Sequence, residues 1–375
     1  MLRWARNGLL VAMAVLLAFV SASLVGALRT PGNESFSAKW ADWLRGHHAE
    51  AVASTLEDWY FTHNQPAKGG TVASLNSIPT TEADPAVTSP PVSTIKHRAP
   101  TNVTPVVEPS VPGEGVWQPT GPAVAGVPGM YIAQFRADTE YTSQITTAAW
   151  IDPTVLRVGI VPGAKEPGGQ WAQPPQVSDA QRPNIVAAFN GGFLLRDAKG
   201  GFFLDGTEAV PLRDGAASIA IHTDGRIELG AWGRDVTMSP TVTAVLQNLT
   251  LLIDNGQIDA AISHNDTRSW GATLGGKIAV ARSGIGITAE GALIYVAGPA
   301  LTAKSLAESL QRAGAIRAMT LDINPEWVTF NLFEHTDPAD PSVLTAAKLY
   351  PQMQRSAERY LSTESRPFFT VSTPG

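Results

Sequence analysis

The first hydrophobic segment of this chain is continuous. Gly8 to Leu28 contains no charged residue, and its 21 residues span about 31 Å at ~1.5 Å per residue, enough to cross the hydrocarbon core of a bilayer. Arg3 and Arg6 precede the segment, which predicts that everything after Arg29 lies outside the cytoplasm. We assign residues 1–29 to a single-pass membrane anchor. The alternative is a secretory signal cleaved after small residues such as Val25-Gly26-Ala27, in which case the protein is secreted.

Between residues 30 and 63 the hydrophobic pattern becomes periodic. Apolar residues recur at three- and four-residue spacing from Ser35 to His63, which predicts one amphipathic helix. Its apolar face consists of Phe36, Trp40, Trp43, Leu44, His47, Ala51, Leu56 and Trp59. This face either lies at the lipid headgroups, where tryptophan is favoured, or packs on a partner helix or the main domain.

Residues 64–114 lack a hydrophobic pattern. Nine prolines between Asn64 and Pro112 interrupt a background of Thr, Ser, Val and Ala. Such a segment cannot bury enough apolar surface to offset the entropy of ordering, so we expect a disordered tether. At ~3.1 Å per residue it would hold the following domain on the order of 100 Å or more from the membrane.

Residues 115–375 show the pattern of one globular domain rich in short strands separated by Gly, Pro and Asp turns. One helix is clear, since Thr302 can cap it, Leu306 and Leu310 supply a buried face, and Gly314 ends it. A second helix is expected near Ala357. The absence of regular strand–helix alternation predicts a mixed α+β fold. The predicted strands are Met130–Arg136, Ile145–Ile151, Leu156–Val161, Ile185–Phe189, Ser218–His222, Arg226–Trp232, Ile278–Ala281, Ala292–Ala297, Ile316–Asp322, Trp327–Phe333 and Phe368–Val371.

The amino-acid composition excludes several classes of chemistry and of binding partner. There is no cysteine, which excludes disulfides, thiolate nucleophiles and cysteine-ligated metals. The net charge is −6 without a basic stretch, so nucleic acid is not an expected partner. No metal is expected, because the seven histidines are scattered and no HExxH or Asp-rich loop occurs. No cofactor is expected either, because phosphate-loop and dinucleotide motifs are absent.

Two candidate sites follow apolar strands in the first half of the domain. Asn190 ends one strand and precedes Gly191 and Gly192, whose amides would approach a ligand closely; an ordinary tight turn is the alternative. Asp205 is followed by Gly206 and, further on, by Arg213. An Asp-Gly pair at a strand end is commonly a turn, so a functional Asp205 would have to face a cleft.

Two further candidates lie later in the chain. Arg268 stands beside Thr267 and Ser269 and would suit a bidentate clamp on phosphate or carboxylate, or else a surface ion pair with Asp266. Asp322 ends an apolar strand, a costly position for a carboxylate unless it is used, paired or makes a turn.

The order of these segments carries more information than any one of them. Phe189-Asn190-Gly191-Gly192-Phe193, then Leu252-Ile253-Asp254-Asn255-Gly256, then Thr267-Arg268-Ser269-Trp270-Gly271, resembles the phosphodiester glycosidase domain family. Leu306-Ala307-Glu308, Gly314-Ala315 and Leu321-Asp322 are similar to the helix and strand before the family's last motif. That motif normally continues into glycines and a serine, whereas here Ile323-Asn324-Pro325-Glu326-Trp327 follows.

The resemblance implies an extracytoplasmic hydrolase acting on a sugar 1-phosphodiester or a related glycosidic bond in envelope or exported glycans. Cleavage at an anomeric carbon needs a carboxylate near an oxocarbenium-like centre, and a phosphate leaving group needs a cation. On this interpretation Asp322 is the base or stabilising carboxylate, Arg268 the phosphate clamp, and Asp205 or Glu326 the second carboxylate. Asn190, with the amides of Gly191 and Gly192, would position sugar or phosphate oxygens, and Arg213 would line the substrate site.

Two other classes of function remain open from the sequence. Glu326 and Trp327 could form a sugar-stacking platform, which would make the domain a non-catalytic binding module for an envelope glycan or glycophosphate polymer. A purely structural envelope protein, working through its tryptophan-rich helix and tether, is the third.

Overall fold

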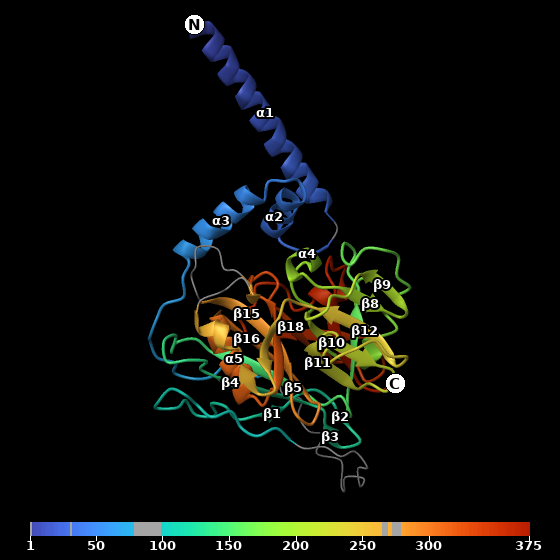
Figure 1. The fold of residues 1–375 in the computed structure, drawn as a ribbon. Coiled ribbons are helices and arrows are strands. Elements are labelled where there is room, and N and C mark those ends of the chain that lie inside the picture. The colour runs from blue at the N-terminus through green and yellow to red at the C-terminus, as the bar shows by residue number, and fades with distance from the viewer. Residues whose placement is uncertain (1, 31, 79–98, 265–268, 272–278) are drawn as a thin grey trace.

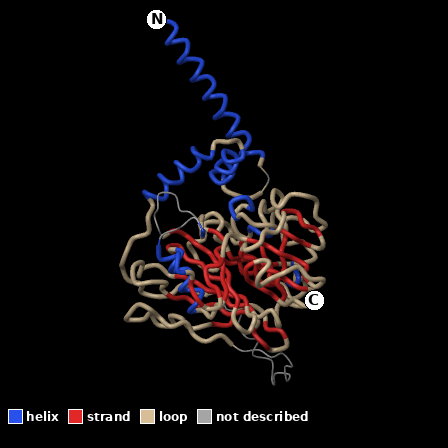
Figure 2. Tube along the Cα trace, in the orientation of Figure 1, coloured by secondary structure: helices blue, strands red, loops and turns tan. Residues whose placement is uncertain are grey.

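The computed structural model describes residues 2–30, 32–78, 99–264, 269–271 and 279–375. Three sheets with antiparallel pairing form the globular part, and the N-terminal helix α1 (Leu2–Arg29) projects away from it (Figure 1). Strands far outnumber helices in this part of the chain (Figure 2). The strand-rich α+β fold expected from the sequence is confirmed.

The largest sheet has eight strands, and the other two have five each. In spatial order the large sheet contains β1 (Gln118–Pro119), β4 (Met130–Phe135), β5 (Thr146–Ile151), β16 (Leu293–Leu301), β15 (Val280–Ile287), β17 (Arg317–Asp322), β13 (Leu251–Asp254) and β14 (Gln257–Ile258). The second sheet contains β11 (Ile227–Ala231), β10 (Ala217–His222), β12 (Val242–Gln247), β8 (Phe202–Leu204) and β9 (Thr207–Val210). The third contains β19 (Leu344–Lys348), β18 (Phe330–His335), β7 (Ile185–Asn190), β20 (Phe368–Ser372) and β6 (Arg157–Val161). A separate hairpin joins β2 (Ala123–Val124) and β3 (Val127–Pro128).

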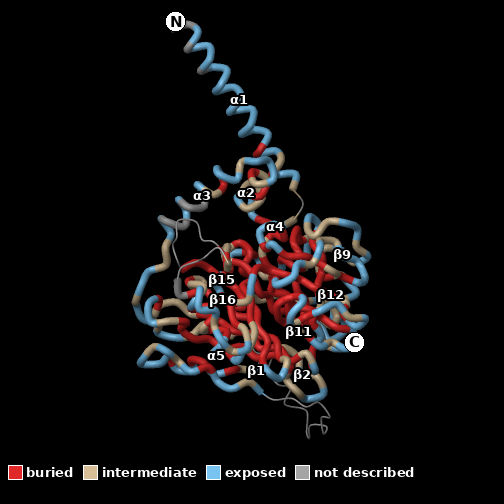
Figure 3. The backbone as a smooth tube through the Cα atoms, viewed as in Figure 1, coloured by how far each residue is buried: buried red, intermediate tan, exposed pale blue. Residues whose placement is uncertain are grey.

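One hydrophobic core joins the three sheets (Figure 3). At its centre the ring of Phe189 stacks on Phe330 at 5.3 Å and on Phe369 at 5.0 Å, and the Tyr295 ring lies 5.3 Å away. Each aromatic pair of this kind stabilises the fold by about 0.5–1.5 kcal/mol beyond the burial of its area. Since Phe189 immediately precedes Asn190, this stack fixes the end of β7.

Helix α5 (Ala303–Arg312) begins and ends as the sequence predicts. Thr302 and Ser305 form a capping box at its start, and Gly314, with φ +104°, follows its end. Leu306 and Leu310 are fully buried against the large sheet. The second helix expected near Ala357 is wrong: the structure has only a short 3-10 turn, Arg359–Leu361, whose arginine and tyrosine side chains are buried.

Residues 35–63 form two helices and not one. Helix α2 (Phe36–Gly46) ends at a glycine, and three residues separate it from α3 (Glu50–His63). Between them His48 has φ +60°, which no helix accommodates. Helix α2 packs on the end of α1, where Trp40 Nε1 donates to Ser23 Oγ at 2.9 Å and Trp43 lies against Gly26 and Phe19. The short helix α4 (Leu195–Ala198) follows β7.

The prediction of a disordered tether is wrong for both of its described parts, residues 64–78 and 99–114. Gly69 donates its N–H to Glu140 O at 2.7 Å, and Asn76 donates to Gln134 Oε1 at 2.8 Å. In the later part Val103 is fully buried, and Glu114 forms a buried ion pair with Arg136 at 2.7 Å. A proline-rich segment can be ordered when its backbone pairs with a sheet edge and it contributes single apolar anchors. Residues 79–98 of the expected tether lie outside the described residues.

Candidate functional site

The ends of β7 and β17 meet at Asn190 and Asp322. Ser283, on the neighbouring strand β15, joins them: its Oγ accepts from Asn190 Nδ2 at 3.2 Å and from the Asp322 N–H at 3.3 Å. Asn190 Oδ1 in turn accepts from the Tyr295 hydroxyl at 3.1 Å. The Asn190 carboxamide is thus buried and held on both sides, so it orients the end of β17.

Asp322 has a buried carboxylate in which one oxygen accepts no hydrogen bond within the described part of the chain. Its side chain is 1% exposed, and Oδ1 accepts from the N–H groups of Ile323 at 2.8 Å and Asn324 at 2.9 Å. Oδ2 accepts no hydrogen bond within the described part of the chain, and the nearest cation is Arg366 Nη1 at 3.5 Å. Burial raises the pKa of Asp322 to about 6, against the lowering effect of Arg366. The carboxylate is therefore ionised at neutral pH and poised to accept a proton.

Arg366 lies between this carboxylate and an aromatic face. Its guanidinium carbon is 3.5 Å from the centre of the Trp327 ring, a stacked cation–π contact. Arg366 Nη2 also approaches Asp42 Oδ2 of α2 at 3.4 Å. Because Trp327 is buried beneath Arg366, its ring does not form the open sugar-stacking platform considered from the sequence.

A cluster of ion pairs adjoins Arg366. Arg355 Nη1 lies 3.3 Å from Glu326 Oε1, and Arg355 Nη2 lies 3.3 Å from Glu364 Oε1. Arg359 forms a two-point ion pair with Glu364 and donates to Thr329 Oγ1 at 3.0 Å. Burial lowers the pKa of Arg355, and the neighbouring Arg359 lowers it further. The Glu326 carboxylate is therefore engaged in an ion pair with Arg355.

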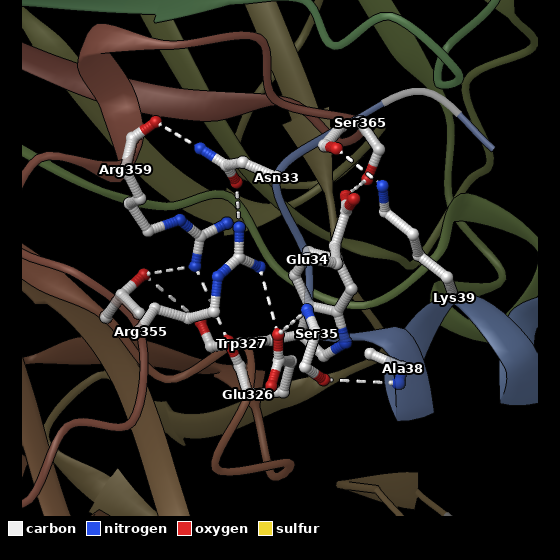
Figure 4. A network of polar contacts seen from close by, with 12 residues as sticks. Asn33, Glu34, Ser35, Ala38, Lys39, Glu326, Trp327, Arg355, Arg359 and Ser365 are labelled. Atoms are coloured by element: carbon white, nitrogen blue, oxygen red, sulfur yellow. Dashed lines mark hydrogen bonds and ion pairs between the residues drawn. The ribbon is translucent and has the colours of Figure 1, made fainter. Parts of the chain in front are cut away.

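The segment that follows α1 covers this cluster (Figure 4). Asn33 Oδ1 accepts from Arg355, and the Glu34 carboxylate accepts from the Ser365 hydroxyl. Ser35 donates its backbone N–H to Glu326 Oε1 at 2.8 Å. Beside these contacts a cavity of about 320 Å³ lies between α2, α3 and the loop Asn324–Trp327. We call residues Asn33–Asp42 the covering segment.

The two glycines after Asn190 allow close packing of the chain on itself. The Gly191 N–H donates to Pro367 O at 3.2 Å, and a Cβ there would lie 2.4 Å from that oxygen. Gly192 has φ +133°, a conformation that side chains disfavour. The Gly191 amide is therefore used within the fold and is not turned toward a ligand, contrary to the expectation from the sequence.

The structure separates three predicted residues from Asp322 or leaves them undescribed. Asp205 has φ +47° and is exposed, and with Gly206 it forms the tight turn between β8 and β9, the alternative named from the sequence. Arg213 is exposed, and its backbone pairs with Gln247. Arg268 lies outside the described residues.

Three residues near Asp322 or Arg366 were not predicted from the sequence. Arg366 directly precedes Pro367 and the last strand, so a charge at a strand entry was the available signal. Ser283 lies within β15, which extends six residues beyond the predicted strand. Glu166 is the third: its N–H donates to Ser365 O at 3.0 Å, and its Oε2 accepts from the Leu195 N–H at 3.0 Å. Burial raises the pKa of Glu166, and Arg366 opposes that shift.

Comparison with known proteins identifies the segment that carries this site. Residues 183–322 match the model of the phosphodiester glycosidase family, so the resemblance inferred from the sequence is confirmed over this segment. None of the curated proteins matches the chain.

Three solved structures are similar at low identity. The zebrafish N-acetylglucosamine-1-phosphodiester alpha-N-acetylglucosaminidase catalytic domain, auto-inhibited by its pro-peptide, has 16% identity and a TM-score of 0.43 over 66% of this chain and 82% of that one. A hypothetical protein from Synechocystis has 13% identity and a TM-score of 0.44, over 68% and 64%. A putative exported protein from Burkholderia pseudomallei has 11% identity and a TM-score of 0.34, over 62% and 74%.

Proposed function

We propose that this chain, whose residues 183–322 match the phosphodiester glycosidase family, is a hydrolase that cleaves a sugar 1-phosphodiester or a related glycosidic bond. One observation carries the proposal. Asp322, the last residue of the matching segment, keeps a buried carboxylate oxygen uncommitted at 3.5 Å from Arg366. A carboxylate and a cation side by side are what cleavage between an anomeric carbon and a phosphate requires.

Each partner in this pair has a distinct task in the proposed reaction. Asp322 stabilises the positive charge that develops at the anomeric carbon or takes a proton from the attacking water. Arg366 neutralises charge on the departing phosphate, the task assigned from the sequence to Arg268. Asn190 and Ser283 hold the end of β17, and so keep Asp322 in place. A phosphate clamp at Arg268 remains part of the proposal as a second cation.

Glu166 is the second carboxylate that we propose in place of Asp205 or Glu326. Its backbone is fixed against Ser365, next to Arg366, and its side chain is anchored through one oxygen at the start of α4. Burial raises the pKa of Glu166, as suits a group that protonates a leaving oxygen. Glu326 is engaged by Arg355 and Ser35, and Asp205 lies in an exposed turn.

We also propose that the site works outside the cytoplasm and close to a membrane. The part of α1 from Arg6 to Arg29 is long and apolar enough to cross a bilayer, although a signal sequence has the same properties. The arginines before the apolar residues favour the orientation that leaves the domain outside. The substrate would then be an envelope or exported glycan.

The proposal is tested with the full-length protein in detergent. It is incubated with benzyl diesters of N-acetylglucosamine 1-phosphate, with nitrophenyl glycosides and with envelope polymers, and release of reducing sugar is measured. Turnover that is lost in Asp322→Asn, while the melting temperature is retained, supports a hydrolase. Binding of a polymer without turnover of any probe would instead identify a binding module.

A further inference from the structure

Three side chains of the domain that face the covering segment act as hydrogen-bond donors, whereas Glu326 and the Arg359 carbonyl accept from Ser35 and Asn33. Arg355 and Ser365 direct an N–H and an O–H toward Asn33 and Glu34 (Figure 4), and Arg366 directs an N–H toward Asp42. The covering segment supplies the matching acceptors: the Asn33 carboxamide oxygen and the carboxylates of Glu34 and Asp42. Two of these three acceptors are anionic. The domain thus presents a donor-lined site that the chain fills with its own carboxylates.

The fit between the covering segment and this site is incomplete. Glu34 Oε2 and Arg366 Nε are buried and make no hydrogen bond within the described part of the chain, and Arg355 Nη1 has only its 3.3 Å ion pair with Glu326. A buried donor or acceptor left unpaired costs about 1–3 kcal/mol, so native proteins rarely keep several together. The carboxylates supply too few oxygens in the positions that these donors face.

A tetrahedral oxyanion matches the donors better than a carboxylate does. Phosphate offers three or four oxygens in different directions, and guanidinium groups bind it through two parallel hydrogen bonds. Glu326 and Glu364 neutralise Arg355 and Arg359 from within the domain, whereas Arg366 has one carboxylate of the domain, Asp322 at 3.5 Å, and its other partner is Asp42 of the covering segment at 3.4 Å. Arg366 is therefore the cation most available to an incoming anion.

We propose that Arg355, Ser365 and Arg366 form a subsite for the phosphoryl group of the substrate, and that Glu34 and Asp42 occupy it in the substrate's absence. This rests on the proposed function in assigning the phosphoryl group to a substrate. All three residues lie beyond the segment that matches the family model. The covering segment competes with the ligand from within the chain, so ligand binding displaces it.

Calorimetry on the full-length protein in detergent tests the subsite with inorganic phosphate and with N-acetylglucosamine 1-phosphate. The variant Glu34→Gln, Asp42→Asn keeps the shape of both side chains and removes their charge. It should bind both probes at least about tenfold more tightly than the natural protein, because the neutral competitor no longer makes a charge-assisted hydrogen bond, and one such bond corresponds to at least about a factor of ten. Glu50→Gln, an exposed change on α3, is the matched control and should change nothing.

Adding Arg366→Met to the double variant should abolish the gain. Equal affinity in the natural protein and the double variant would overturn the subsite, as would equally tight binding of N-acetylglucosamine without phosphate. Tighter binding of acetate than of phosphate would show a carboxylate site and also overturn it. Binding needs no turnover, so a protein that binds phosphate but hydrolyses no probe keeps the subsite and loses the proposed function.

Limited proteolysis of the natural protein provides an answer even if the variants do not fold. Lys39 lies between Glu34 and Asp42, Arg45 follows Asp42, and both Lys39 and Arg45 lie on α2. Phosphate should accelerate tryptic cleavage after these residues several-fold over chloride at the same ionic strength. An unchanged cleavage rate at saturating phosphate would refute displacement of the covering segment.

Discussion

Replacing Asp322 by Asn should change how the stability of the protein depends on pH. The pKa of Asp322 is about 6 in the folded protein against an ordinary 3.8. Since the folded state holds this proton more tightly, the protonated group stabilises the fold below about pH 4, and that stability is lost as pH rises through 6. The shift corresponds to roughly 3 kcal/mol in total, of which roughly 2 kcal/mol falls between pH 4 and pH 7.

Urea unfolding followed by tryptophan fluorescence at pH 4, 5, 6 and 7 measures this effect. The free energy of unfolding of Asp322→Asn should rise relative to the natural protein by about 2 kcal/mol across this range. Asp337→Asn is the matched control, because Asp337 accepts the N–H of the residue two positions later, at 2.8 Å, as Asp322 does, but is exposed. Its difference from the natural protein should stay constant.

Activity supplies an independent measurement of the same group. If the ionised carboxylate performs the reaction, kcat/KM should fall below an apparent pKa near 6 and Asp322→Asn should lose about a hundredfold or more in kcat. Parallel stability curves for Asp322→Asn and the natural protein, together with a rate independent of pH from 5 to 8, would refute a carboxylate kept poised by burial.

Three further predictions concern other parts of the molecule. Glu166→Gln should slow hydrolysis of a glycoside with a poor leaving group about a hundredfold. It should slow hydrolysis of a phosphodiester much less, because phosphate departs without a strong acid. Equal effects on both substrates would argue against Glu166 as the acid. Glu114→Ala should lower the free energy of unfolding by about 3–5 kcal/mol, because Arg136 is left buried without its carboxylate. The control Glu108→Ala, at an exposed position, should change the free energy of unfolding by less than about 0.5 kcal/mol. A similar small effect from both variants would show that residues 99–114 do not stabilise the domain. Protease added to cells with a permeabilised outer envelope should release the domain, and complete protection until lysis would contradict an external location.

The sequence predicts α5 and eleven of the strands because their signals are local, but it misses other strands, among them β12, β13 and β19. Capping by Thr302, the spacing of Leu306 and Leu310, and Gly314 beyond the helix all act within a few residues. Asn190 and Asp322 can be recognised for the same reason, since each is a polar residue at the end of an apolar strand. Their meeting through Ser283 depends on strand order, which no local pattern encodes.

The errors have a common physical cause. Residues 64–78 and 99–114 look disordered by composition, but Asn76 bonds to Gln134 on the distant strand β4 and Glu114 pairs with Arg136. Arg366 owes its place beside Asp322 to the pairing of β20 with β7. Each of these depends on contacts between residues far apart in the chain, which hydrophobic periodicity does not encode.

The short connection between α1 and the covering segment limits how far the domain can lie from the end of α1. Helix α1 ends at Arg29 and Asn33 already contacts Arg359 and Ser362, so the intervening residues can reach at most about 14 Å when fully extended. With α1 in a bilayer, the proposed site at Asp322 would therefore stay close to the lipid headgroups and would not reach the distances that a long tether permits. If the proposed hydrolase activity holds, only glycans whose scissile bond lies near the headgroups would be cut, and the protein would reach them by lateral diffusion in two dimensions.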